Sequence, residues 1–113
     1  MFEEAAYQAR PTGGESLERA LSTQEGPFLL TFSAEWCPPC RALKPVLDRI
    51  ARELGQRLKV LVVDADQNPS LVEKFRVEGI PTTLLLVGGK VLDRIAGVQP
   101  FESFRKRLEK ALV

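Results

Sequence analysis

The chain contains no histidine and only two cysteines, Cys37 and Cys40, among its 113 residues. A structural zinc site needs four cysteine or histidine ligands, so a single chain cannot complete one with these residue types. Two chains could still pool four thiolates around zinc or an iron–sulfur cluster. The sequence therefore predicts no metal site within one chain and leaves a site shared by a dimer as an alternative.

An excess of charge of one sign and long apolar runs are also lacking. Sixteen lysines and arginines balance fifteen aspartates and glutamates, which gives a net charge of +1. Nucleic acids and anionic membrane surfaces favour a clear basic excess, so neither is expected as a partner. The sequence has no run of 18 apolar residues, which predicts no transmembrane helix. Residues 1–14 lack the basic and apolar regions of a secretory signal, so we expect a cytoplasmic protein unless a leader has already been removed.

The composition that is present is that of a folded domain. Hydrophobic residues make up 44% of the chain and charged residues 27%, unlike the composition of disordered segments. A chain of this length buries roughly two-thirds of its unfolded surface, so an apolar core is expected. We predict a single domain over residues 1–113, in which residues 1–15 form an N-terminal segment that could add a short edge strand.

Three apolar segments predict strands. Residues 27–34 and 58–66 are apolar for most of their length, which is typical of buried strands. Residues 81–97 are two apolar stretches joined by Gly88 and Gly89, which predicts a hairpin and therefore one antiparallel pair.

Leucine and isoleucine spacing predicts helices between and after these strands. Residues 41–54 carry apolar side chains at spacings of four, three and four, and Pro45 is expected to kink this helix. Strands that alternate with helices pair in parallel, so we predict an α/β fold with a mixed sheet and helices on both faces. Further helices are predicted over residues 68–75 and 100–113 and around Leu17 and Leu21.

Cys37 and Cys40 lie between the first predicted strand and the first long helix. A disulfide between them would close a loop of two residues, which restrains the unfolded chain too little to stabilise a domain. At a helix N-terminus, however, free N–H groups and the helix dipole favour a thiolate. We therefore predict a redox pair, in which Cys37 is an exposed nucleophile and Cys40, one turn further along, resolves the mixed disulfide. Pro39 suits the first helical turn.

Three segments resemble the thioredoxin family in matching order and spacing: FSAEWCPPCR, VDADQNP and VEGIPTTLLLVGGKV. The resemblance extends over residues 16–113. It implies a thioredoxin fold, with a central mixed sheet of four to five strands flanked by helices. It also implies thiol–disulfide oxidoreductase activity on protein disulfides, with the Cys37–Cys40 disulfide serving in place of a separate cofactor. A thioredoxin-reductase-like electron donor and a monomeric protein are expected.

The resemblance also implies a substrate-binding site. In the family, the proline that matches Pro81 is cis and faces the cysteines, and the backbone beside it pairs with substrate like an added strand. An apolar rim around Cys37 would consist of Trp36, Ile80, Thr82, Gly97 and Val98. Trp36 could instead be a core residue, and Gly97 could be only a turn glycine.

The chain departs from the family pattern at three positions. Pro38 stands between the cysteines where glycine is usual, so the loop loses flexibility and one N–H donor. Thr31 stands where the family typically buries an aspartate that accepts a proton, and Val62 replaces the lysine that often pairs with it. Threonine does not accept a proton near neutral pH. We therefore expect slow resolution by Cys40, with a flat pH dependence near neutrality, and Glu35 is a candidate base.

Two other functions stay open at this point. The altered dipeptide Pro38-Pro39 could shift the same chemistry towards disulfide oxidation or isomerisation. A peptide-binding or chaperone module that uses the cysteines little is the alternative of a different class.

Overall fold

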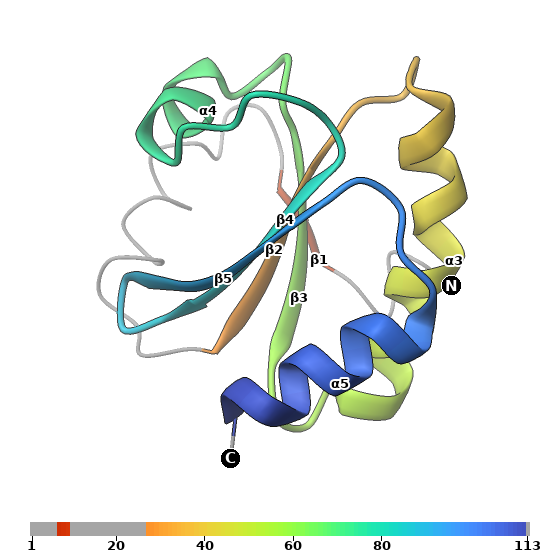
Figure 1. Ribbon diagram of the computed structural model, residues 1–113. Coiled ribbons are helices and arrows are strands. Elements are labelled where there is room, and N and C mark those ends of the chain that lie inside the picture. Colours follow the sequence, from red (N-terminus) through yellow and green to blue (C-terminus); the bar gives the residue numbers. More distant parts are fainter. Residues whose placement is uncertain (1–6, 10–26, 113) are drawn as a thin grey trace.

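The computed structural model describes residues 7–9 and 27–112, in which the chain forms five strands and three helices (Figure 1). The order of elements over residues 27–112 agrees with the prediction, whereas the helix predicted around Leu17 and Leu21 lies outside the described residues. The elements are β1 Tyr7–Ala9, β2 Phe28–Ser33, α3 Pro38–Leu54, β3 Lys59–Asp64, α4 Pro69–Lys74, β4 Thr82–Val87, β5 Lys90–Ala96 and α5 Phe101–Leu112.

The strands form one mixed sheet in the order β1-β3-β2-β4-β5. β3 pairs in parallel with both β1 and β2. Between β2 and β3 the chain crosses one face of the sheet as α3, which permits their parallel pairing. β4 pairs antiparallel with β2 and with β5, the second strand of the hairpin. The predicted mixed sheet is confirmed, and β1, within the N-terminal segment, forms one of its edges.

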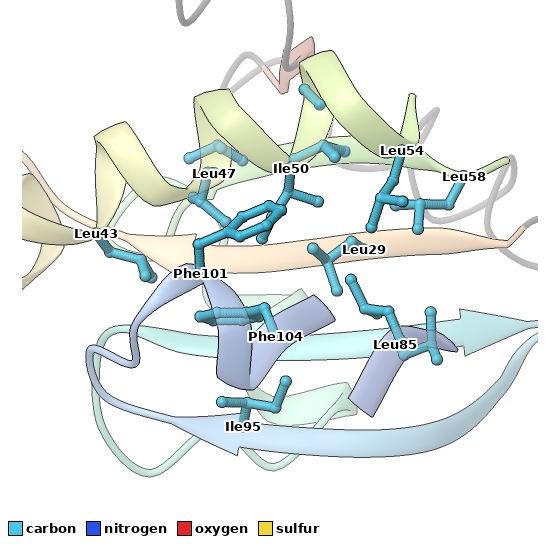
Figure 2. Packing of buried hydrophobic residues seen from close by; sticks show 14 residues of the cluster. Leu29, Leu43, Leu47, Ile50, Leu54, Leu58, Leu85, Ile95, Phe101 and Phe104 are labelled. Atoms are coloured by element: carbon cyan, nitrogen blue, oxygen red, sulfur yellow. The ribbon is translucent and has the colours of Figure 1, made fainter. Parts of the chain in front are cut away.

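Side-chain alternation along the strands divides the core between the two faces of the sheet. Leu29 of β2 and Leu85 of β4 face α3 and α5, where apolar residues of both helices cover them (Figure 2). Leu30 and Phe32 of β2 face the other way and pack with Leu71 of α4 and with Phe75, the C-cap of that helix. Helices therefore cover both faces, as the sequence predicts. Among the described residues, none of the helices has the length and apolarity needed to cross a membrane.

The starts of α3 and α4 fall where the sequence predicts them, and only the side-chain cap of α4 differs. α3 begins at Pro38, directly after the N-cap Cys37, which confirms the predicted place of Cys37 at the helix N-terminus, and it continues to Leu54 with Pro45 inside it. Both Pro38 and Pro39 fit the first turn because the N–H groups there have no partner within the helix. Asn68 occupies the predicted N-cap of α4, but its side chain makes no capping bond and donates instead to the Asp64 carbonyl at 2.9 Å.

Three segments that are distant in sequence meet at the edge of the sheet that is formed by the carboxyl ends of β2 and β3. β2 and β3 are parallel, so the cysteine loop after Ser33 and the turn after Asp64 lie at the same edge. β4 is antiparallel to β2, and Thr82 pairs with Phe32, which places the start of β4 and the preceding Pro81 at that edge too. This edge carries the candidate active site.

Candidate active site

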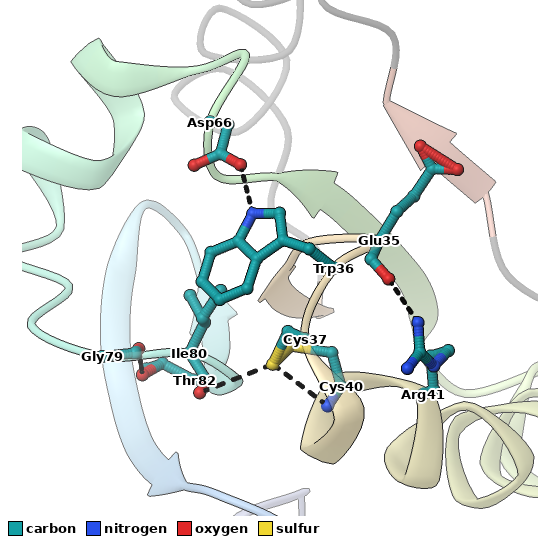
Figure 3. Close-up of a disulfide and its surroundings, with 9 residues drawn as sticks. All are labelled: Glu35, Trp36, Cys37, Cys40, Arg41, Asp66, Gly79, Ile80 and Thr82. Atoms are coloured by element: carbon teal, nitrogen blue, oxygen red, sulfur yellow. Dashed lines mark hydrogen bonds between the residues drawn. A yellow bond between two sulfur atoms is a disulfide. The ribbon is translucent and has the colours of Figure 1, made fainter.

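Cys37 and Cys40 form a disulfide at the start of α3, with their Cα atoms 5.2 Å apart (Figure 3). Cys37 is the N-cap residue of the helix. Its sulfur accepts the backbone N–H of Cys40 at 3.3 Å, and its carbonyl accepts the N–H of Arg41 at 3.2 Å. Cys37 therefore accepts the first two backbone N–H groups of α3, those of Cys40 and Arg41.

The two prolines of this turn carry no N–H group, so the turn has no further donors. Pro38 and Pro39 are both exposed and have no N–H, so neither leaves a helix donor without a partner. The N–H of Cys40 is thus the first donor of α3, and it is directed at the Cys37 sulfur. A hydrogen bond of this kind favours a thiolate at Cys37 when the disulfide is reduced.

The expectation that Cys37 is exposed is wrong for the disulfide form. Cys37 is 3% exposed and Cys40 is 5% exposed, so the two residues do not differ in burial. Both form an apolar cluster with Ala34, and Ile80 packs against this cluster. The contact with Ile80 buries Cys37, and it depends on a segment 43 residues away in sequence.

The proline loop faces the disulfide as the family resemblance implies. The peptide bond between Ile80 and Pro81 is cis, and the Ile80 carbonyl oxygen lies 4.0 Å from the Cys37 sulfur. Gly97 has a φ of +73°, a conformation that glycine adopts without strain, and donates its N–H to the Pro81 carbonyl at 2.9 Å. The Thr82 hydroxyl donates to the Gly79 carbonyl at 2.5 Å. These bonds fix the loop from both sides.

Trp36 and Val98 are large apolar side chains exposed on the surface. Trp36 is 65% exposed and is therefore not a core residue, and Val98 is 43% exposed. The indole Nε1 of Trp36 donates to the Asp66 carboxylate at 2.6 Å, which holds the ring beside Cys37 and Ile80 (Figure 3). An exposed tryptophan fixed next to a disulfide is suited to contact with another protein.

The site that the family usually fills with a buried aspartate holds a hydroxyl pair. Thr31 is buried, and its Oγ1 lies 2.9 Å from Oγ1 of Thr83, across β2 and β4. Val62, on the other side of Thr31 in the sheet, is also buried. The sheet therefore carries no charge at these positions, and each threonine hydroxyl has a partner.

Cys40 lies beside a cleft of about 480 Å³ between the sheet and α3. Glu35, the predicted base, contributes to this cleft, but in Figure 3 its carboxylate extends away from the two sulfurs. Its main-chain carbonyl accepts a bond from Arg41 Nη1 at 2.8 Å. The cleft is lined by Thr31, Ser33, Ala34, Glu35, Cys40, Arg41, Lys44, Leu47, Val62, Val63 and Asp64.

Asp64 also lines the cleft, although no motif in the sequence predicted it as a site residue. The alternation of side chains along β3 places Asp64 on the same face as Val62, so the spacing of two residues was the available signal. Among the described residues, no group of three or more histidine, cysteine, aspartate or glutamate side chains is placed to hold a metal ion.

A disulfide at a helix start, facing a cis-proline loop across the edge of a mixed sheet, defines the class of dithiol–disulfide exchange proteins. A family model described as Thioredoxin matches residues 9–110. Thioredoxin 1 of Chlorobaculum tepidum is 37% identical over 98 residues, which cover 87% of this chain and 97% of that protein. Thioredoxin of Bacillus subtilis is 38% identical over 90 residues, which cover 80% of this chain and 86% of that protein. The chain therefore belongs to the thioredoxin family.

A solved structure extends the agreement to three dimensions. The crystal structure of thioredoxin from Trypanosoma brucei brucei superposes with a TM-score of 0.82 at 28% identity, over 93% of this chain and 88% of that one. The fold is thus the thioredoxin fold. The family and the cysteine pair together make the protein a thiol–disulfide oxidoreductase that acts as a disulfide reductase.

Proposed function

We propose that the sequence Cys37-Pro38-Pro39-Cys40 is the active site and that it reduces disulfides of other proteins. The observation that carries the proposal is the hydrogen bond from the Cys40 N–H to the Cys37 sulfur at the first turn of α3. It favours the thiolate at Cys37, which then attacks one sulfur of the substrate disulfide and forms a mixed disulfide. Cys40 attacks the Cys37 sulfur in turn, which releases the second substrate thiolate and leaves the Cys37–Cys40 disulfide.

The proposed substrate-binding site consists of Trp36, the loop from Ile80 to Thr82, Gly97 and Val98. The exposed surfaces of Trp36 and Val98 provide apolar contacts, and the fixed loop from Ile80 to Thr82 provides backbone beside the sulfur. Gly97 supports this loop through its bond to the Pro81 carbonyl. An extended protein segment is the substrate that fits a narrow backbone surface of this kind.

The cysteine pair carries the two electrons of the reaction, so the proposal includes no separate cofactor. Each turnover leaves the disulfide form, and a thioredoxin-reductase-like donor of two electrons must reduce it again. A monomer is sufficient for this reaction, because both cysteines and the proposed binding residues come from one chain. A cytoplasmic location, a single domain over residues 1–113 and a role for Glu35 in proton transfer remain predictions.

Insulin disulfide reduction with dithiothreitol as electron source tests the proposal. We expect activity in the wild type and none in Cys37→Ser. Cys40→Ser is the matched control, because it keeps the nucleophile and should accumulate a mixed disulfide. Activity that is the same in Cys37→Ser and in the wild type would contradict the proposal and would favour a peptide-binding module.

The direction of exchange is tested by the reduction potential. Titration against dithiothreitol or glutathione couples should give a value near that of thioredoxin, about −270 mV. A value near about −120 mV, typical of a strong oxidant, would instead support disulfide oxidation by the same cysteine pair.

A further inference from the structure

The proposed reaction needs a proton acceptor that the sheet interior does not provide. Cys40 must lose its thiol proton when it attacks Cys37, because the thiolate is the attacking form. Thr31 is buried and lines the same cleft as Cys40, and its hydroxyl is bonded to the Thr83 hydroxyl. A threonine hydroxyl does not take up a proton near neutral pH. The acceptor must therefore lie elsewhere in the surroundings of Cys40.

The cleft beside Cys40 contains a carboxylate at the end of β3. Residues 62 and 64 point to the same face of the sheet, the face that α3 covers, and Ser33 pairs with Asp64 at the end of β2. Two residues along a strand advance about 7 Å, so Asp64 lies about that distance beyond Val62 towards the active-site edge. Cys40 and Asp64 line the same cleft of about 480 Å³.

The position of the Asp64 side chain is fixed by the turn that follows it. Its Oδ1 accepts the backbone N–H of Asp66 at 2.9 Å and that of Gln67 at 3.3 Å. Both bonds use the same oxygen, and no hydrogen bond to Oδ2 is formed by a described residue. The residue is half-buried. One carboxylate oxygen is thus held by the turn while the other can accept a proton.

The other charged groups of the cleft fit this role less well. Arg41 and Lys44, on α3, are cations that have no lone pair to accept a proton at neutral pH. Glu35, in the loop before α3, directs its carboxylate away from the sulfurs (Figure 3). β2 adds Thr31 and Ser33, which are not titratable in this range. Asp64 is the remaining acceptor among the described residues of the cleft.

We propose that Asp64 accepts the proton of Cys40, through water in this cleft, during resolution of the mixed disulfide. The proposal rests on the proposed function. As the proton leaves the Cys40 sulfur, the electron pair that remains on this sulfur attacks the Cys37 sulfur. The bond from Cys37 to the substrate sulfur breaks at the same time. The substrate sulfur leaves as a thiolate, the Cys37–Cys40 disulfide forms, and Asp64 later returns the proton to solvent.

Stopped-flow reaction of the reduced protein with 5,5′-dithiobis(2-nitrobenzoate) separates the two steps. Attack by Cys37 releases one thionitrobenzoate, and resolution by Cys40 releases a second. In Asp64→Asn, whose amide oxygen can still accept the two turn N–H bonds, we expect an unchanged first phase. The second phase should be about tenfold slower from pH 6 to 7.5, a modest value for general base catalysis because water intervenes. The two proteins should converge above pH of about 8.5, where a thiol ionises unaided.

Glu73→Gln, at an exposed carboxylate of α4 outside the cleft, is the matched control and should change neither phase. Glu35→Gln removes the other carboxylate of the cleft, so its comparison with Asp64→Asn assigns the proton transfer to one of the two. A second phase in Asp64→Asn that equals the wild type at every pH would overturn the proposal. So would a loss that is equal at acid and alkaline pH, which would indicate a structural effect, or a loss that appears in Glu35→Gln instead. Absence of both phases from the wild type would refute the proposed function itself.

Discussion

Thr31 and Thr83 share a hydrogen bond of 2.9 Å between their hydroxyls, which joins the central strand β2 to its neighbour β4. Both side chains are buried, and β2 pairs with β4 at this position. The bond explains how the chain tolerates two buried polar groups at the centre of the sheet. Each hydroxyl satisfies the other, and Val62 beside them needs no partner.

Replacement of one threonine should cost more than replacement of both. Thr31→Val leaves the Thr83 hydroxyl buried without a partner, so we expect the free energy of unfolding to fall by about 1–2 kcal/mol. The double variant Thr31→Val, Thr83→Val removes both polar groups and should recover most of this loss. Urea unfolding of the wild type, Thr31→Val, Thr83→Val and the double variant measures the coupling. Strictly additive losses would show that the two hydroxyls do not act as a pair.

Pro38 controls how many N–H donors lie near the Cys37 sulfur. Pro38→Gly adds one free N–H to the first turn of α3, where Cys40 supplies the first donor now. Partial positive charge at this helix end should favour the Cys37 thiolate, and we expect alkylation of Cys37 by iodoacetamide at pH 6.5 to become about two- to fivefold faster. The control is Pro38→Ala, which adds the same donor with less backbone freedom. Faster alkylation in the glycine variant alone would assign the effect to flexibility.

Asp66 should order the indole of Trp36 through its bond to Nε1. Trp36 is the single tryptophan of the chain, so its fluorescence reports on this position alone. In Asp66→Ala we expect lower fluorescence anisotropy and an increase of about two- to fivefold in KM for insulin, because a bond to a charged acceptor is lost. Asp66→Asn retains an acceptor and should lie close to the wild type. Equal anisotropy in all three proteins would show that the bond does not order the ring.

Much of the fold and part of the site could be predicted from the sequence because those features depend on local patterns. Apolar runs located β2 and β3, and Gly88 with Gly89 located the hairpin. The spacing of Cys37 and Cys40 placed both sulfurs on one helical turn, as the structure shows. The cis bond before Pro81 followed only from the family resemblance, since sequence alone gives an X–Pro bond about a 5% chance of being cis.

The features that the sequence did not predict depend on contacts between distant segments. Cys37 is buried because Ile80 packs against it, and no pattern near residue 37 indicates that contact. The bond between Thr31 and Thr83 depends on the pairing of β2 with β4. Asp64 enters the cleft because β3 lies beside β2 with Ser33 and Asp64 in register. The alternation of side chains along β3 predicts which face of the sheet Asp64 lies on. Its proximity to Cys40 could not be predicted, because it depends on where α3 packs on that face.

The ion pair between Asp93 and Arg107 should make stability depend on pH in the acid range. Arg107 donates to both carboxylate oxygens, at 2.6 and 2.9 Å, and joins β5 to α5. The hydrogen bond from Arg107 holds the pKa of Asp93 below its usual value, against the opposing effect of burial. A lowered pKa in the folded state adds stability above the unfolded pKa of about 3.9, and this stability is lost as pH falls through the folded value.

Arg107→Gln should therefore lower the free energy of unfolding by about 0.5–1 kcal/mol at pH 7, the range for a partly exposed pair. The difference from the wild type should stay constant down to about pH 5 and shrink at lower pH, as Asp93 becomes protonated in both states. Thermal unfolding from pH 2.5 to 7 measures it. Lys106→Gln, at an exposed position of the same helix, controls for the lost charge. A deficit in Arg107→Gln that persists unchanged at pH 2.5 would mean that the arginine stabilises the protein through packing against β5 rather than through the Asp93 carboxylate.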